Sequence, residues 1–362
     1  MGCAASKDTN EDFHQTVVTP GVGSPSAQQA QLNLEYTREV TLAELSTITS
    51  SCSAYFELDG LLASVESGAI APIKGRWLVR LHEQGGRLKR RQDMPAEAFW
   101  SPGELRRVAT QLGDNFGVLF VALSYRWLAR EHPDPNGFHL AIVAAASKLY
   151  LGLAGKQASS SPLVAALHSL GMDTDFALFW DFSSLFQSPR SEAETVLFER
   201  GLEVSNVWYG HSRSVCWMQS ELPEGFDGVA YDKSGWCFVE AAISAAVKVG
   251  FNRLDLSKRT TRAMEWCYGA SSWANEARLD CVCTGRRLPP PTPEQVRHRL
   301  ETEMTFTNQA DVAAVSDLYS TFFSTVMACL EHLDVHNLSW GAEEVETLCG
   351  VVPRFSKLTL IE

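Results

Sequence analysis

The sequence predicts an α/β protein in which helices flank a parallel sheet, with an N-terminal extension and a helical C-terminal extension. Three short apolar runs, at 117–124, 174–182 and 214–220, have the length and continuous apolarity of buried parallel strands. Helical patterns at 138–155 and 191–211 lie between them. This alternation indicates a sheet covered on both faces, with its binding site at the carboxyl ends of the strands.

The composition is that of a folded globular protein with an acidic balance. Of its 362 residues, 45% are hydrophobic and 20% charged, and the formal net charge is −12. An acidic chain lacks the Lys and Arg excess that contacts phosphates, so we expect no nucleic-acid partner. No apolar run approaches the roughly 18 residues of a membrane-spanning helix. The nine cysteines show no disulfide or zinc-site spacing, so we expect reduced thiols, no metal site and an intracellular protein.

The opening residues, MGCAASKDTN, fit a double acylation signal. Removal of the initiator methionine exposes Gly2 for N-myristoylation, and Ser6 lies at the position that the acyltransferase recognises. Cys3, beside Gly2, is a natural palmitoylation site. One myristoyl chain binds membranes only marginally, whereas two acyl chains hold a protein there stably. Residues 1–40 are otherwise rich in Ser, Thr, Gln, Gly and Pro, which predicts a disordered tether. We therefore expect the protein on the cytosolic face of a membrane.

The N-terminal extension, residues 41–115, combines helical and strand-like segments. TLAELSTITS and SPGELRRVATQL both begin with capping-box residues and predict helices. Between them, residues 73–92 alternate like two strands around a turn at Gly85–Gly86. The basic run Arg87–Arg91 in this hairpin is either a solvated face or a contact for lipid or phosphate.

The core, 116–287, continues with a helix that begins after Ser234, and its pattern becomes more helical from Arg259. LPPPTPEQ then marks a stiff linker into a capped helix, which opens the C-terminal extension at 288–362. We expect the longest amphipathic helix at 308–333. The tail VPRFSKLTLIE resembles the first turn of a leucine-rich repeat. One repeat cannot build a solenoid, so this tail is an edge element or a vestige.

Three segments reach the predicted carboxyl edge of the sheet with polar or aromatic residues: LSYRW, FWDFSSL and SGWCFVE. Together they resemble the Toll/interleukin-1 receptor (TIR) domain family, over roughly residues 117–250. The stretch ELPEGFDGVAYDK, at 221–233, stands where that family has a short serine-rich turn. The positions that match the family are Ser124, Tyr125 and Arg126 in the first segment, Asp181 in the second, and Ser234, Trp236, Cys237 and Glu240 in the third.

The resemblance implies a TIR-like or flavodoxin-like sheet and a set of candidate site residues. In enzymatic TIR domains the helix glutamate lies against the ribose of NAD while the bond to nicotinamide is cleaved. A buried carboxylate stabilises the oxocarbenium-like ribose that this departure leaves. NAD is therefore the implied substrate or ligand, and no other cofactor is expected. The resemblance makes Glu240 the candidate catalytic residue, and Tyr125, Arg126, Trp127, Asp181 and Trp236 the candidate ligand-binding residues.

The same residues also have ordinary structural interpretations. Glu240 fits a first-turn acid favoured by the helix dipole, and Arg126 fits a surface residue. Trp236 and Cys237 fit core packing, and Cys237 has no histidine nearby in sequence to activate it as a nucleophile. His132, His139 and His211 lack the spacing of a metal site.

Three functions remain open at this point. We favour a membrane-anchored signalling adaptor or regulator, because Met-Gly-Cys starts with a nearby Ser-Lys are typical of kinetoplastid flagellar-membrane proteins. The resemblance of this start implies a flagellar (ciliary) or plasma membrane, and the core also resembles an uncharacterised group of protist proteins. A weaker likeness to the cAMP-response proteins of these protists implies adenylate cyclase as a partner, and TIR domains commonly self-associate. The alternatives are an NAD glycohydrolase that uses Glu240 and a cytoskeletal or coat linker, which no feature favours.

Overall fold

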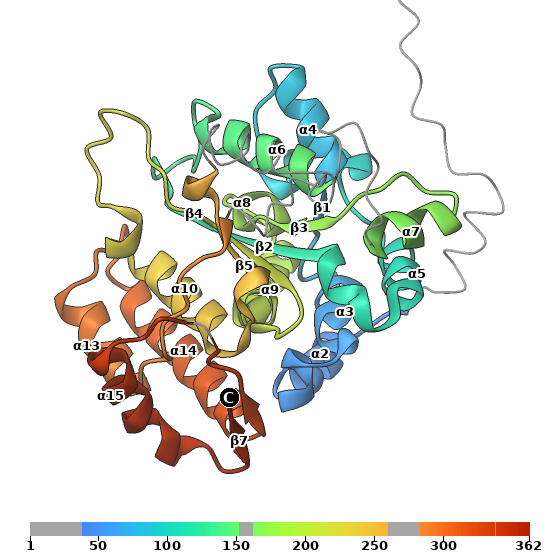
Figure 1. Ribbon diagram of the computed structural model, residues 1–362. Helices are drawn as coiled ribbons and strands as arrows, with labels where there is room; N and C mark the ends of the chain where they lie inside the picture. Colours follow the sequence, from blue (N-terminus) through green and yellow to red (C-terminus); the bar gives the residue numbers. More distant parts are fainter. Residues whose placement is uncertain (1–37, 152–161, 260–282, 337) are drawn as a thin grey trace, which may run out of the picture.

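The computed structural model describes residues 38–151, 162–259, 283–336 and 338–362. Within these ranges twelve α-helices surround a mostly parallel five-stranded sheet, so the α/β prediction is confirmed (Figure 1). The acylation sites Gly2 and Cys3, nearly all of the predicted tether, and residues 260–282 lie outside the described residues.

The sheet has the strand order β1-β3-β2-β4-β5. Its central strand, β2 (Phe120–Tyr125), pairs in parallel with β3 (Ala177–Phe179) and β4 (Val215–Gln219). Strand β5 (Arg253–Asp255) extends the parallel order beyond β4, and β1 (Ile73–Lys74) adds an antiparallel edge to β3. The three apolar runs are strands, as predicted, but each is shorter than its run.

Helices cover the two faces of the sheet (Figure 1). On one face α4 (Gly75–Glu83) packs against α6 (Phe138–Tyr150). On the other face α10 (Gly235–Val247) packs between α9 (Glu192–Gly210) and α14 (Asp311–Met327). The predicted helices at 138–155, 191–211 and after Ser234 therefore form, and they enclose the sheet as the alternation indicated. Shorter elements connect these layers: α7 (Pro162–Ser169), α8 (Asp181–Ser184), η5 (Tyr231–Lys233), η6 (Gly250–Asn252) and η7 (Leu256–Lys258).

The predicted hairpin at 73–92 is wrong, because most of its first half is helix α4. Leu78 is fully buried and Leu81 lies one turn further along, so the apolar residues have helical spacing that a two-residue alternation obscured. The basic run ends on Arg91, whose guanidinium donates hydrogen bonds to the carbonyls of Gly68, Ala69 and Ser184. Arg91 is thus a structural residue, neither a solvated face nor an anion contact.

The N-terminal extension is helical and packs onto the sheet. Both predicted capping boxes form, at Thr41 with Glu44 and at Ser101 with Glu104. The elements of this region besides β1 and α4 are α2 (Leu42–Thr49), η1 (Cys52–Tyr55), α3 (Leu58–Glu66), η2 (Arg91–Asp93), η3 (Ala96–Ala98), α5 (Pro102–Leu112) and η4 (Gly113–Leu119).

The C-terminal extension opens with α13, capped by Thr292 as predicted. The prediction that the segment 308–333 forms the longest helix is wrong, because α14 has 17 residues whereas α9 has 19. Of the two interpretations of the tail, the edge element is confirmed, because β7 pairs in parallel with β6. The elements besides α14 are α13 (Pro293–Thr302), β6 (His332–Leu333), α15 (Ala342–Val351), η8 (Val352–Arg354) and β7 (Leu360–Ile361).

One hydrophobic core, from Val40 to Val351, joins both extensions to the sheet. A disulfide between Cys52 on η1 and Cys329 after α14 links the two extensions directly. The prediction of reduced thiols is therefore wrong for this pair. The two cysteines are 277 residues apart, and only folding brings their Cα atoms to 6.4 Å, so sequence spacing contained no sign of the bond.

Candidate functional site

A cavity of about 390 Å³ opens at the carboxyl end of the sheet, where the strand–helix alternation placed the site. Side chains from β2, the β3–α8 junction, α9, α10 and the segment before α14 surround it. Every candidate catalytic or ligand-binding residue from the sequence lines this one cavity: Tyr125, Arg126, Trp127, Asp181, Trp236 and Glu240.

The parallel register explains why residues so far apart in sequence meet here. Tyr125 is the last residue of β2, and Asp181 follows two residues after β3 ends. Because β2 and β3 run in parallel, both strand ends lie at one edge. Glu240 projects toward this edge from the second turn of α10. The interpretation of Glu240 as a first-turn acid is therefore wrong, since no acid lies in the first turn.

Glu240 is held by the sheet behind it. The Ser124 hydroxyl donates to Glu240 Oε2 at 2.6 Å. The Tyr209 hydroxyl of α9, which donates to the carbonyl of Leu123 at 3.2 Å, also lowers the pKa of Glu240. Burial is the main cause that raises the pKa of Glu240 to about 8; the nearby Asp181 charge adds to this rise, whereas the hydrogen bonds of Ser124 and Tyr209 oppose it. In the free protein Glu240 is thus mainly protonated at neutral pH, and a cationic neighbour would favour its ionisation.

The Asp181 carboxylate differs from that of Glu240 because it already accepts hydrogen bonds from three donors. It accepts hydrogen bonds from the Tyr125 hydroxyl at 2.7 Å, from Trp127 Nε1 at 2.9 Å and from the amide of Phe182 at 2.6 Å. Burial raises the pKa of Asp181, and these hydrogen bonds oppose the shift. Asp181 therefore orients two aromatic side chains of the cavity. The Tyr125 hydroxyl, which the sequence assigned to ligand binding, is committed to Asp181.

Two guanidinium groups at the cavity are available to an anion. Arg126 is half-buried and Arg130 is exposed, and both line the cavity. Neither side chain forms a hydrogen bond or ion pair with another residue of the described chain, and Arg126 Nε is buried without a partner. His139 Nε2 lies 2.9 Å from the carbonyl of Arg126, which holds the loop after β2 in place. Guanidinium groups in such positions suit phosphate oxygens.

The C-terminal extension supplies a wall that no sequence motif indicated. Phe306 packs against Gly235, where an added Cβ would lie only 2.0 Å from Phe306 Cζ. Trp236 Nε1 donates to Asp311 Oδ2 at 3.1 Å, so this tryptophan belongs to the cavity wall. The lining residues from this extension are Thr305, Phe306, Thr307, Asn308 and Asp311.

Cys237 has the packing role that its ordinary interpretation predicts. It is buried, and its Sγ lies 3.3 Å from the carbonyl of Tyr125. Burial raises the pKa of the Cys237 thiol far above its usual range, with Glu240 adding to the shift. A thiol that stays protonated is a poor nucleophile, so Cys237 fastens α10 to β2.

His132, His139 and His211 have structural roles as well. Each has a ring nitrogen at hydrogen-bonding distance from a backbone carbonyl: His132 with Leu88 and His211 with Glu57, in addition to His139. Across the described ranges, no group of three or more His, Cys, Asp or Glu side chains is arranged to hold a metal ion. No helix among the same residues has both the length and the apolarity to cross a membrane.

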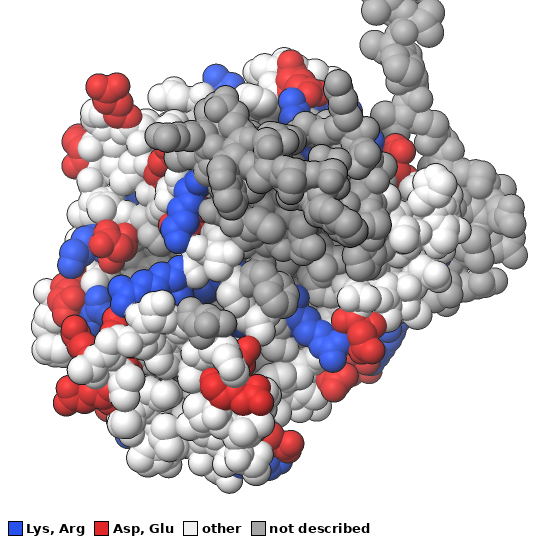
Figure 2. Space-filling model, in the orientation of Figure 1, with Lys and Arg blue, Asp and Glu red and all other residues white. Residues whose placement is uncertain are grey.

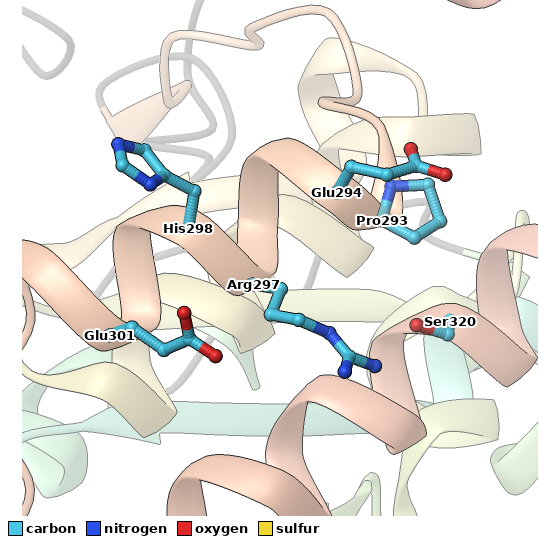
Figure 3. Close-up of a pocket in the computed structure, with 6 residues that line it drawn as sticks. All are labelled: Pro293, Glu294, Arg297, His298, Glu301 and Ser320. Carbon is cyan, nitrogen blue, oxygen red and sulfur yellow. The ribbon is translucent and has the colours of Figure 1, made fainter.

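A second hollow of about 390 Å³ lies on the surface between α13 and α14, and Figure 3 shows its lining. Two of its charged side chains have partners outside it, since Glu294 pairs with Arg354 and Arg297 pairs with Asp317. Exposed, already paired charges give no ligand a strong electrostatic contact. The cavity at the sheet edge is therefore the better candidate site.

No protein-family model, curated protein or solved structure matches the chain.

Proposed function

We propose that this chain is a TIR-like enzyme that cleaves the bond between nicotinamide and ribose in NAD. The observation that carries the proposal is that Glu240 lines one cavity with Tyr125 and Arg126. The strand order supports it, because the four parallel strands follow the order 2-1-3-4 in the chain, as in flavodoxin-like sheets. Such sheets bind ligands at the carboxyl ends of their strands, and this cavity opens at the carboxyl ends of β2 and β3.

The protonation of Glu240 suits a cationic substrate. The nicotinamide ring of NAD carries a positive charge, and this charge beside Glu240 would favour the carboxylate over the acid. As the bond breaks, its electron pair leaves with nicotinamide, and the ribose becomes an oxocarbenium ion that the carboxylate stabilises. A water molecule then adds to the anomeric carbon and releases one proton. The products are nicotinamide and ADP-ribose.

The other lining residues fit the rest of this substrate. Arg126 and Arg130 would contact the pyrophosphate, since neither guanidinium has a partner within the described chain. The indole rings of Trp127 and Trp236 line the same cavity and offer aromatic surfaces to the nicotinamide and adenine rings.

The test is nicotinamide release from NAD by the purified full-length protein, with and without lipid vesicles on which it can cluster. We expect turnover, with kcat/KM rising with pH up to about 8, the pKa of Glu240 in the free protein. Glu240→Gln should lower kcat by about 10²–10³-fold. The control Glu199→Gln changes an exposed glutamate on α9 and should have no effect. Absence of nicotinamide release in every form would refute the proposal.

A membrane-anchored signalling role is compatible with this activity and rests on the sequence MGCAASK. In this proposal the doubly acylated N-terminus holds the protein at a flagellar or plasma membrane, where adenylate cyclase is a candidate partner. Figure 2 shows basic side chains beside acidic ones at several places on the face in view, which supports anchoring by acyl chains. Gly2→Ala should move the protein to the soluble fraction. Immunoprecipitation from membranes that recovers no signalling protein would contradict the adaptor role.

A further inference from the structure

The insertion at 221–233 brings a tyrosine into contact with the network behind the cavity. Residues 221–230 are exposed or half-buried and connect β4 to η5. The chain then turns inward at Tyr231, which is only 9% exposed. Its hydroxyl lies 2.7 Å from Ser124 Oγ on the central strand. A surface loop therefore ends on a buried polar contact with β2.

This contact continues directly to Glu240. The Ser124 hydroxyl donates its single proton to Glu240 Oε2 at 2.6 Å. A serine hydroxyl has one proton and two lone pairs, so in the contact with Tyr231 it is Ser124 that accepts. The donors thus follow one direction, from Tyr231 through Ser124 to the carboxyl group.

We propose that Tyr231 is a positioning residue for Glu240 and acts on it through Ser124. A serine hydroxyl that lacks a second partner can rotate among several acceptors. Donation from Tyr231 occupies one lone pair of Ser124 and keeps its proton directed at Glu240. Aligned hydrogen bonds also polarise one another, which strengthens the donation to an ionised carboxylate. The catalytic meaning of this inference rests on the proposed function, whereas the hydrogen-bonded chain can be tested without turnover.

Other groups also act on Glu240, from every side of its helix. Tyr209 of α9 lowers its pKa and Asp181 raises it, while Cys216 of β4 and Cys237 of α10 lie close enough to couple to its charge. Arg126 and Asp311 share the cavity with it. Tyr231 and Ser124 do not line the cavity, so they reach Glu240 from within the protein. Their removal should therefore change Glu240 without removing a ligand contact.

The first experiment follows the Glu240 carboxyl carbon by NMR in protein labelled with ¹³C-glutamate, with Glu240→Gln to assign the signal. Tyr231→Phe removes only the hydroxyl group and should raise the pKa of Glu240, and Ser124→Ala should raise it more. Tyr319→Phe is the matched control, because Tyr319 is a buried tyrosine whose hydroxyl donates to the carbonyl of Pro291. It should leave the Glu240 titration unchanged. If Tyr231→Phe titrates like the control, the proposal is overturned.

A double-mutant comparison tests whether Tyr231 acts through Ser124. In a Ser124→Ala background, Tyr231→Phe should have no further effect on the Glu240 titration, because the connecting hydroxyl is gone. Additive effects of the two changes would overturn the stated route.

Kinetics give the functional readout. We expect Tyr231→Phe to lower kcat about 5-fold with KM unchanged, the factor that corresponds to one hydrogen bond. The rise of kcat/KM should move to higher pH. A lower kcat with an unmoved pH profile would indicate a merely structural role and overturn the proposal. If NAD is not cleaved at all, the proposed function fails, and the NMR comparison still decides on the hydrogen-bonded chain.

Discussion

Helix α10 has an ionisable group near each end, a half-buried glutamate and a fully buried lysine, and the two groups have opposite surroundings. Glu240, in its second turn, faces the cavity. Lys248, which caps the other end, is fully buried. The Lys248 ammonium group donates to the carbonyls of His211 at 2.5 Å and Ser214 at 2.6 Å, and to the hydroxyl of Ser214 at 2.8 Å. One group is open to a ligand, and the other is enclosed by protein acceptors.

Burial changes both groups in the same sense, because it disfavours the charged form of each. It raises the pKa of Glu240 to about 8 and lowers the pKa of Lys248 to about 7. A shifted pKa is therefore not evidence of function by itself. The cavity makes the difference, since it gives Glu240 a place for a reacting molecule, whereas all three N–H bonds of Lys248 already have acceptors.

The two extensions produce this contrast. At the Lys248 end, the N-terminal extension covers the loop after α9: the amide of Ser212 donates to the carbonyl of Tyr55 at 2.9 Å, and His211 Nε2 lies 3.1 Å from the carbonyl of Glu57. At the Glu240 end, the C-terminal extension contributes Phe306 and Asp311 to an open wall. The N-terminal extension thus covers the Lys248 end of α10, whereas the C-terminal extension forms part of the cavity wall at the Glu240 end.

The largest expected effect tests the closed end. Lys248→Met removes three hydrogen bonds and leaves the buried carbonyls of His211 and Ser214 without this donor, so we expect a loss of about 2–5 kcal/mol of unfolding free energy. Urea denaturation measures it, with exposed Lys357→Met as the control. NAD cleavage per folded molecule should be unchanged. Normal stability with lost activity would instead place Lys248 in the functional machinery.

The pH dependence of stability should distinguish the two ends by sign. The folded pKa of Glu240, about 8, exceeds its ordinary 4.5, so its stabilising contribution is complete below pH 4.5 and is lost as pH rises through 8. Lys248, lowered from 10.5 to about 7, contributes fully above pH 10.5 and loses this contribution as pH falls through 7.

Glu240→Gln isolates the first of these terms, because glutamine does not titrate. Its unfolding free energy relative to the wild type should increase by up to about 1.4 kcal/mol for each pH unit between 5 and 8. Chemical denaturation of both proteins at several pH values measures the difference. A difference that is constant with pH would show that Glu240 has an ordinary pKa.

The disulfide should matter for stability and little for the cavity. Cys52→Ser should lower the unfolding free energy by about 2–4 kcal/mol, with kcat/KM of the folded protein unchanged. Cys349→Ser, at an exposed free cysteine, is the control. Thiol labelling without reductant should modify Cys349 and leave Cys52 and Cys329 unmodified. Labelling of the pair in protein from cells would mean that its compartment keeps it reduced.

The smallest expected effect concerns the wall of the open end. Asp311→Ala removes the acceptor of Trp236 Nε1, so we expect KM for NAD to rise about 5-fold while kcat changes little. Asp317→Ala, at an exposed residue of the same helix, is the control. Steady-state kinetics at several NAD concentrations separate the two constants. A fall in kcat with KM unchanged would instead assign Asp311 a role in the chemical step.

Much of the fold could be predicted from the sequence because the responsible interactions are local. The capping boxes at Thr41 and Ser101 act within three residues, and the apolar runs of the three inner strands are continuous. Strand–helix alternation then placed LSYRW, FWDF and GWCFVE at one edge. The error at 73–92 arose where a helical and an alternating pattern share the same apolar residues.

The sequence by itself therefore determined which residues of the strand ends and of α10 meet at the carboxyl edge of the sheet, but not the wall that Phe306 and Asp311 add. Only the tertiary structure decided their roles, because these depend on contacts between distant residues. Glu240 is mainly protonated at neutral pH because folding removes much of its solvent and places it near Asp181, and it is oriented by Ser124, 116 positions away. Tyr231 from the insertion contacts Ser124, Asp311 from the C-terminal extension contacts Trp236, and the Cys52–Cys329 bond joins the two extensions. Burial and long-range hydrogen bonds set charge and orientation, and a local pattern contains neither.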